Sequence, residues 1–147
     1  MKNVIIYTDG SCSGNPGPGG WAALLIFGET KKECMGAVAE TTNNRMELRA
    51  ALEALLSLKE PCQVKLHTDS AYLKNAFTQG WIKNWQKNGW RTASKKPVEN
   101  QDLWKKLITE NERHTIEWIK VKGHSTDEYN NLVDGMAVAV RKEQFGV

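Results

Sequence analysis

Two acidic residues of this chain stand in matching local sequences. The dipeptide Thr-Asp occurs as Thr8 and Asp9 and again as Thr68 and Asp69, each time at the end of a stretch with the composition of a β-strand. If the two strands are parallel neighbours, their carboxyl ends share one edge of a sheet and the two carboxylates converge. A single aspartate at such a place is commonly a turn or helix cap. The repetition favours a functional pair.

Two further acids fall in predicted helices. Glu47 lies in the first turns of a helix predicted over residues 43–58, where an alternative role is the glutamate of a capping box begun by Asn44. Asp134 lies in a helix predicted over residues 127–142, and an acid beside an apolar stripe is commonly solvated. Taken together, the four acids form an all-oxygen ligand set, which is the kind that Mg²⁺ or Mn²⁺ prefers.

The order of the predicted elements gives an α/β fold. Residues 10–20 are rich in glycine and proline and predict a tight loop. The first three strands form an antiparallel meander, and helical connections make the later strands parallel neighbours, so we expect a five-stranded mixed sheet with helices on both faces. Strands are predicted over residues 4–8, 21–27, 33–40, 63–68 and 115–121, and helices over 43–58, 70–77, 100–111 and 127–142.

Size and composition predict one domain over residues 1–147. The longest apolar run, residues 21–27, is far shorter than the about 20 residues of a membrane-spanning helix, and the N-terminus lacks a signal-peptide core. The three cysteines are widely spaced without a C-x-x-C pair, which disfavours a disulfide framework or a zinc site. We therefore expect a cytoplasmic protein with no membrane contact, monomeric and without an obligate protein partner.

Charge is unevenly distributed along the chain. The formal net charge is +3, but residues 74–106 hold eight basic and two acidic residues and carry +6, which leaves −3 for the remainder. This basic block also contains Trp81, Trp85 and Trp90. A basic block on a slightly acidic body predicts a polyanionic partner, such as a nucleic acid, that is bound at one place.

Five motifs together resemble a known family. They are TDGSCSGNPGPGGWA at 8–22, TTNNRMEL at 41–48, HTDSAYL at 67–73, WIKNWQKNGWRTASKKPVEN at 81–100, and VKGH at 121–124 followed by Asp134. In this order, and from about residue 3 to residue 142, the chain resembles bacterial type 1 ribonuclease H. The resemblance implies the ribonuclease H-like fold and hydrolysis of the RNA strand of RNA–DNA hybrids, leaving 5′-phosphate and 3′-hydroxyl ends.

The resemblance also implies roles for individual residues. Asp9, Glu47, Asp69 and Asp134 match the catalytic carboxylates of the family, which hold two Mg²⁺ ions, with Mn²⁺ as a possible substitute. His124 matches the loop histidine that assists proton transfer and product release, and the ordinary pKa of histidine, near 6.5, suits proton transfer at neutral pH.

Substrate contacts are implied at two places. Cys12, Asn15, Thr42, Asn43 and Asn44 match positions that touch the minor groove or the DNA phosphate, although turn and cap chemistry would also explain them. The handle, residues 81–100, is implied to follow the DNA strand, although its tryptophans could equally serve packing. Its matching residues are Trp81, Lys83, Trp85, Lys87, Trp90, Arg91, Lys95 and Lys96.

Three positions depart from the pattern, and three other functions remain open. Ala71 stands where many relatives carry glutamine, which removes a groove contact, and Gln86 and Asn88 reduce the charge of the handle.

The alternative functions are a hybrid-binding module without catalysis, a DNA-cutting relative of the transposase or resolvase type, and a basic α/β protein whose acids are structural caps. A binding module would lose one or more carboxylates, and a DNA-cutting relative would lack the Trp-Lys handle. A metal titration of the purified protein would distinguish the basic α/β protein, whose acids are only caps, from the other functions.

Overall fold

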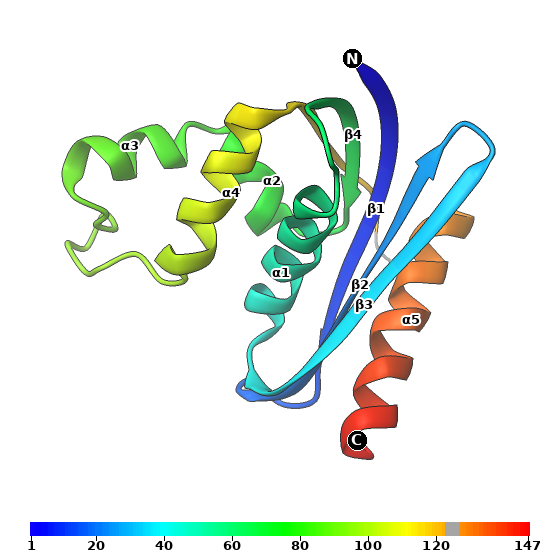
Figure 1. The fold of residues 1–147 in the computed structure, drawn as a ribbon. Helices are drawn as coiled ribbons and strands as arrows, with labels where there is room; N and C mark the ends of the chain where they lie inside the picture. Colours follow the sequence, from blue (N-terminus) through cyan, green and yellow to red (C-terminus); the bar gives the residue numbers. More distant parts are fainter. Residues whose placement is uncertain (123–126) are drawn as a thin grey trace.

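A computed structural model describes residues 1–122 and 127–147 of the chain (Figure 1). After an initial run of three strands the elements follow the predicted order, with one further helix, at residues 81–88, that the sequence analysis does not predict. The elements are β1 (Lys2–Cys12), β2 (Gly17–Phe27), β3 (Thr30–Thr41), α1 (Asn43–Leu56), β4 (Cys62–Thr68), α2 (Ala71–Thr78), α3 (Trp81–Asn88), α4 (Gln101–Arg113), β5 (Thr115–Lys120) and α5 (Glu128–Phe145).

The five strands form one mixed sheet in the order β3-β2-β1-β4-β5. β1 pairs antiparallel with β2, and β2 antiparallel with β3, whereas β1 and β4 are parallel, as are β4 and β5. The predicted fold class is therefore confirmed. Tyr7 of β1 lies opposite His67 of β4, so the chain reaches Asp9 and Asp69 at the same edge of the sheet.

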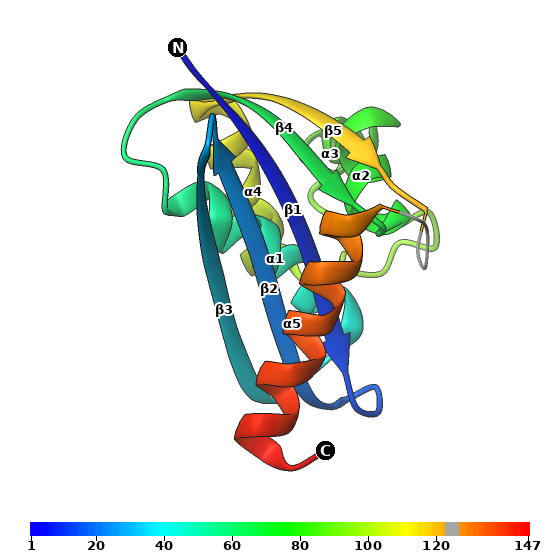
Figure 2. The ribbon, with the colours of Figure 1, turned by 90° about the vertical axis from the view of Figure 1, so that its right-hand side faces the viewer.

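Helices cover both faces of the sheet (Figure 2). α1 packs against β1 and β2 on one face, and α5 packs against β1, β2 and β3 on the other. In β2, Ala23 and Leu25 belong to the large core that contains α1, whereas Ala22 and Leu24 are buried with Val133 of α5. Burial on both faces explains why β2 is an unbroken apolar run rather than an alternating one.

The prediction that residues 10–20 form a loop throughout was wrong. β1 continues and β2 begins inside this segment, and Ser11 is paired with Gly20 in the antiparallel ladder. Only residues 13–16 connect the two strands. The segment is therefore mostly sheet, despite a composition that is typical of turns.

Close approach of helices explains two of these glycines. A Cβ on Gly10 would lie 2.5 Å from the backbone nitrogen of Glu47, and a Cβ on Gly20 would collide with the carbonyl oxygen of Ala137. Glycine inside a strand is often a site where another backbone comes close. Here it lets α1 and α5 pack directly on the sheet.

The other boundaries differ little from prediction. β3, α4 and α5 each extend a few residues further than predicted, and α1 ends at Leu56 rather than at residue 58. None of the helices in the described parts of the chain is both long enough and apolar enough to cross a membrane.

Candidate active site

Three acidic side chains from three elements meet at the carboxyl edge of the sheet. They are Asp9 of β1, Glu47 of α1 and Asp69, which follows β4 directly, and each offers a carboxylate oxygen within 4.8 Å of the others. Asp9 and Glu47 are buried, with 3% of each residue exposed, and Asp69 is half-buried. Parallel pairing of β1 with β4 brings the two aspartates together, as the repeated Thr-Asp dipeptide predicts.

Glu47 is held in place by the strand beneath its helix. Its Oε1 accepts a hydrogen bond of 2.9 Å from the backbone N–H of Gly10, while its Oε2 is buried without a hydrogen-bond partner. The alternative reading as part of a capping box begun by Asn44 was wrong. The helix is instead capped by Thr42, whose hydroxyl accepts from the backbone N–H of Arg45.

Asp134 of α5 approaches the same cluster from the opposite face of the sheet. It lies within hydrogen-bonding reach of Asp9 and lines the same pocket. This pocket has a volume of about 400 Å³. Its lining comprises Asp9, Gly10, Asn43, Asn44, Glu47, Asp69, Ser70, Ala71, Tyr72 and Asp134. All four predicted carboxylates therefore border one cavity.

Burial and mutual repulsion make the pocket unfavourable for negative charge. Burial raises the pKa of Asp9 from 3.8 to about 7, and the charge of Asp69 and the hydrogen bond with Asp134 raise it too, whereas hydrogen bonds with Glu47 and Gly10 lower it. The pKa of Glu47 is also raised well above its usual value, by burial first and then by Asp9. A carboxyl surrounded by others ionises readily only when a positive charge is nearby.

The donor set fits a hard divalent cation. All side-chain ligands are carboxylate oxygens, which suit Mg²⁺, Mn²⁺ or Ca²⁺ and disfavour zinc sites built from sulfur and nitrogen. The Oε2 of Glu47 is a buried acceptor without a hydrogen-bond partner, on a residue whose carboxylate meets those of Asp9 and Asp69. A cation would give this oxygen the positive partner that the described protein atoms do not supply.

The predicted groove residues lie beside the pocket. Asn43 and Asn44 open α1 and line the cavity. The side-chain oxygen of Asn15 accepts a hydrogen bond of 3.1 Å from the backbone N–H of Asn43, which joins the connection between β1 and β2 to the start of the helix. The thiol of Cys12 contacts the carbonyls of Gly17 and Thr41. The structure thus gathers Cys12, Asn15, Thr42, Asn43 and Asn44 into one region.

The handle projects away from the sheet (Figure 1). α3 runs between two glycines with left-handed backbone, Gly80 and Gly89, and a short bridge pairs Arg91 with Pro97. The rings of Trp81, Trp85 and Trp90 are half-buried and pack on one another and on the large core. The predicted cations of the handle are all exposed, namely Lys83, Lys87, Arg91, Lys95 and Lys96.

His124 lies outside the described residues. On the C-terminal side, Asp127 caps α5, and its Oδ1 accepts hydrogen bonds from the backbone N–H groups of Tyr129 and Asn130. The proton-transfer role of His124 stays a prediction.

Tyr72 and Arg45 were not predicted as site residues. Tyr72 lines the carboxylate pocket, and its hydroxyl accepts from the side chains of Asn100 and Trp104. Arg45 reaches Asn100 and Asp102 at the start of α4. Both residues lie inside the quoted motifs, but their partners are far along the chain and no local pattern indicates them.

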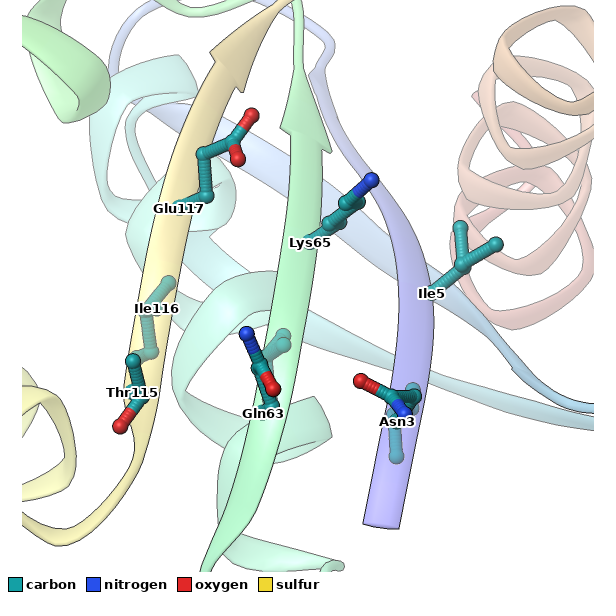
Figure 3. A pocket seen from close by; sticks show the side chains of 9 residues that line it. Asn3, Ile5, Gln63, Lys65, Thr115, Ile116 and Glu117 are labelled. Carbon is teal, nitrogen blue, oxygen red and sulfur yellow. The ribbon is translucent and has the colours of Figure 1, made fainter. Parts of the chain in front are cut away.

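A second pocket lies at the opposite ends of the strands (Figure 3). It has a volume of about 330 Å³ and lies on the face of β1, β4 and β5 that α5 leaves open. Its labelled side chains include Lys65 and Glu117, of opposite charge, with Asn3, Gln63 and Ile5 beside them. No cluster of acids like that at the carboxyl edge occurs here among the described residues, so the chemistry is assigned to the other pocket.

Sheet order and carboxylate pocket together define an α/β protein with an acidic site suited to divalent cations. Comparison with known proteins then gives the family. The RNase H family model matches residues 1–142. The chain is 62% identical to the ribonuclease H of Caldanaerobacter subterraneus subsp. tengcongensis, an alignment that covers 99% of this chain and 97% of the relative. It is 60% identical to the ribonuclease H of Moorella thermoacetica, covering 99% and 98%.

A solved structure agrees with these relatives. LC9-RNase H1, described as a type 1 RNase H with the type 2 active-site motif, superposes with a TM-score of 0.87 at 30% identity, over 98% of this chain and 74% of that one. This chain belongs to the ribonuclease H family and is an enzyme of that family, a nuclease. The resemblance found in the sequence is thereby confirmed.

Proposed function

We propose that the protein hydrolyses the RNA strand of RNA–DNA hybrids as an endonuclease, leaving 5′-phosphate and 3′-hydroxyl ends. Asp9, Glu47, Asp69 and Asp134 would hold two Mg²⁺ ions, which Mn²⁺ could replace. The observation that carries the proposal is the convergence of three carboxylates, each with an oxygen within 4.8 Å of the others, together with a buried oxygen of Glu47 that has no hydrogen-bond partner. Family membership supplies the reaction class.

The carboxylates act first as a binding set. When bound, the two cations would activate a water and stabilise the leaving 3′-oxygen of an in-line displacement. Because Asp9 and Glu47 hold protons more tightly than ordinary carboxyls, they must release protons when cations bind. The N–H of Gly10 fixes the position of one oxygen of Glu47 and leaves the other for the site.

Substrate recognition would come from two surfaces on either side of the pocket. Asn43 and Asn44 present short polar groups beside the carboxylates, which suits a minor groove with 2′-hydroxyls on one strand. The exposed cations of the handle suit the phosphates of the DNA strand. Ala71 lines the pocket and offers only a methyl group there, so the groove contact that glutamine would make is missing.

His124 is proposed to assist proton transfer and product release. Organisation as one catalytic domain over residues 1–147, the monomeric state and the cytoplasmic location stay predictions from the sequence. They do not alter the chemistry assigned to the pocket.

A strand-specific cleavage assay tests the proposed function. The substrates are an RNA–DNA hybrid labelled on either strand, duplex RNA and duplex DNA, each with Mg²⁺ or with EDTA. Cleavage of only the RNA strand of the hybrid is expected, with a 3′-hydroxyl that a polymerase can extend, and no cleavage in EDTA. Cleavage of duplex DNA would favour the transposase-like alternative, and cleavage that persists in EDTA would contradict the metal site.

A further inference from the structure

Arg45 lies in the first turn of α1, between the groove residue Asn44 and the carboxylate Glu47. Its guanidinium donates to both side-chain oxygens of Asp102, over 3.0 and 2.8 Å, and to the side-chain oxygen of Asn100 over 3.2 Å. These partners lie at the start of α4, where the chain leaves the handle. Arg45 therefore joins the start of α1 to the exit of the handle.

Asn100 extends this connection toward the carboxylate pocket. Its amide donates to the hydroxyl of Tyr72 over 3.1 Å, and the indole N–H of Trp104 donates to the same hydroxyl over 3.2 Å. Tyr72 lines the carboxylate pocket. Asn100 has a left-handed backbone with φ of 64°, which asparagine tolerates better than most residues. Arg45, Tyr72, Asn100 and Asp102 are called the Arg45 junction below.

The junction also contacts the aromatic cluster of the handle. Trp104 packs on Trp85 with ring centroids 5.5 Å apart, and Trp85 packs on Trp90 at 5.7 Å. The backbone N–H of Val98 donates to the carbonyl of Trp90, which fixes the end of the handle just before Asn100. Because Trp104 bonds to the hydroxyl of Tyr72, these contacts connect the junction to the handle.

The ion pair at the junction suits positioning better than stabilisation. The side chains of Arg45 and Asp102 are 33% and 60% exposed, and exposed ion pairs add little to the stability of a fold. A two-pronged contact between guanidinium and carboxylate nevertheless fixes orientation in a way that a lysine does not. Hydrogen bonding from Arg45 lowers the pKa of Asp102 to about 2, so Asp102 stays charged even in mildly acidic solution.

We propose that Arg45 is a positioning residue that sets the distance between the handle and the carboxylates, and through it the place along the hybrid where the RNA strand is cut. This inference rests on the proposed function. The handle holds one strand and the pocket cuts the other, so a looser junction allows the scissile phosphate to sit at more than one position. A misplacement of 1 Å can cost about 10²-fold in rate.

The test compares Arg45→Met, Arg45→Lys, Asp102→Ala and the double variant Arg45→Met with Asp102→Ala against the wild type. Arg49→Met is the matched control, because it removes the same charge from the same helix and breaks the half-buried pair of Arg49 with Glu53. The readouts are the distribution of cut sites on end-labelled hybrids of fixed sequence, kcat and KM, and the urea midpoint in EDTA.

Both Arg45→Met and Asp102→Ala should spread the cut sites over neighbouring phosphates and lower kcat/KM by about tenfold, below the roughly 10²-fold loss of a full 1 Å misplacement. The double variant should be no worse than Arg45→Met, because the two residues act through one contact. Arg45→Lys should not restore the wild-type distribution, and Arg49→Met should keep it.

Three outcomes would overturn the inference. They are wild-type cut sites in Arg45→Met, full restoration by lysine, and a loss of activity that follows the urea midpoint while the cut sites stay unchanged. The last outcome would show a merely structural role. Failure of the wild type to cut any hybrid would instead contradict the proposed function. The wild-type reaction alone would show that failure, independently of the variants.

Discussion

Gly10 and Glu47 are joined where α1 packs on β1: the backbone N–H of the glycine donates to Oε1 of the glutamate over 2.9 Å. The absence of a side chain makes this contact possible, since a Cβ on Gly10 would lie 2.5 Å from the backbone nitrogen of Glu47 and 2.6 Å from the carbonyl carbon of Met46. Gly10 thus allows α1 to pack closely on β1 and orients the side chain of Glu47, a proposed metal ligand.

Gly10→Ala should therefore damage both stability and activity. The added methyl group would push the start of α1 away from β1, and overpacking of this kind typically costs about 1–3 kcal/mol. Urea unfolding and the cleavage rate with Mg²⁺ would measure the two effects. Gly135→Ala is the control, because a Cβ at this helical glycine meets nothing within 4 Å, and it should raise stability by about 0.5–1 kcal/mol. Equal stability of Gly10→Ala and the wild type would contradict the packing described.

Asp9→Asn should abolish cleavage and stabilise the metal-free protein at neutral and higher pH. The pKa of Asp9 rises from 3.8 to about 7 on folding, so the folded state binds more protons between these values. The corresponding stability is complete below about pH 4 and is lost as the pH rises to about 7. Asparagine does not titrate, so the Asp9→Asn variant should not lose this part of the stability as the pH rises.

The measurement is urea unfolding in EDTA at pH 5 and pH 8 for both proteins. The wild type should lose stability between the two values, and Asp9→Asn should reduce that loss by about 1–3 kcal/mol. An identical pH dependence would show that Asp9 is not strained by its surroundings. Added Mg²⁺ should stabilise the wild type at pH 8 by mass action and stabilise Asp9→Asn much less.

Most of the element order and the meeting of the two aspartates could be predicted because both follow from local signals, whereas the helix at residues 81–88 was missed. Strand composition, helix period and a repeated Thr-Asp dipeptide each report on a few neighbouring residues. A glycine does not indicate one local structure, since it occurs in turns, in left-handed backbone and where two backbones pack closely. The strand ends around Gly10 and Gly20 were therefore missed. The partners of Glu47, Arg45 and Tyr72 come from distant segments, which no local pattern indicates.

Neutralising the handle should weaken binding and leave the chemistry intact. Replacement of Lys87, Arg91, Lys95 and Lys96 by glutamine should raise KM with little change in kcat. Each lost phosphate contact removes up to about 0.9 from the slope of log K against log salt. Lys32→Gln with Lys59→Gln, two exposed lysines outside the handle, should leave KM and its salt dependence close to wild type. An unchanged salt slope in the handle variant would show that its charges are merely solvated.

His124→Ala should lower kcat with little effect on KM, because proton transfer acts in turnover rather than in binding. General acid–base assistance is typically worth about 10²–10⁴-fold. Steady-state kinetics at pH 7 would check this, and an unchanged kcat would remove His124 from the mechanism.

The most direct measurement uses DNA duplexes that carry one, two, four or more consecutive ribonucleotides in one labelled strand. Asn43 and Asn44 lie beside Glu47 in one pocket, so the proposed groove reading and metal binding would be coupled. A polar group left without its 2′-hydroxyl partner costs about 1–3 kcal/mol. Several such contacts together demand a run of ribonucleotides. We predict Mg²⁺-dependent cleavage only within runs of several ribonucleotides and none at a single one, whereas efficient cutting at a single ribonucleotide or in all-DNA duplex would contradict the assignment.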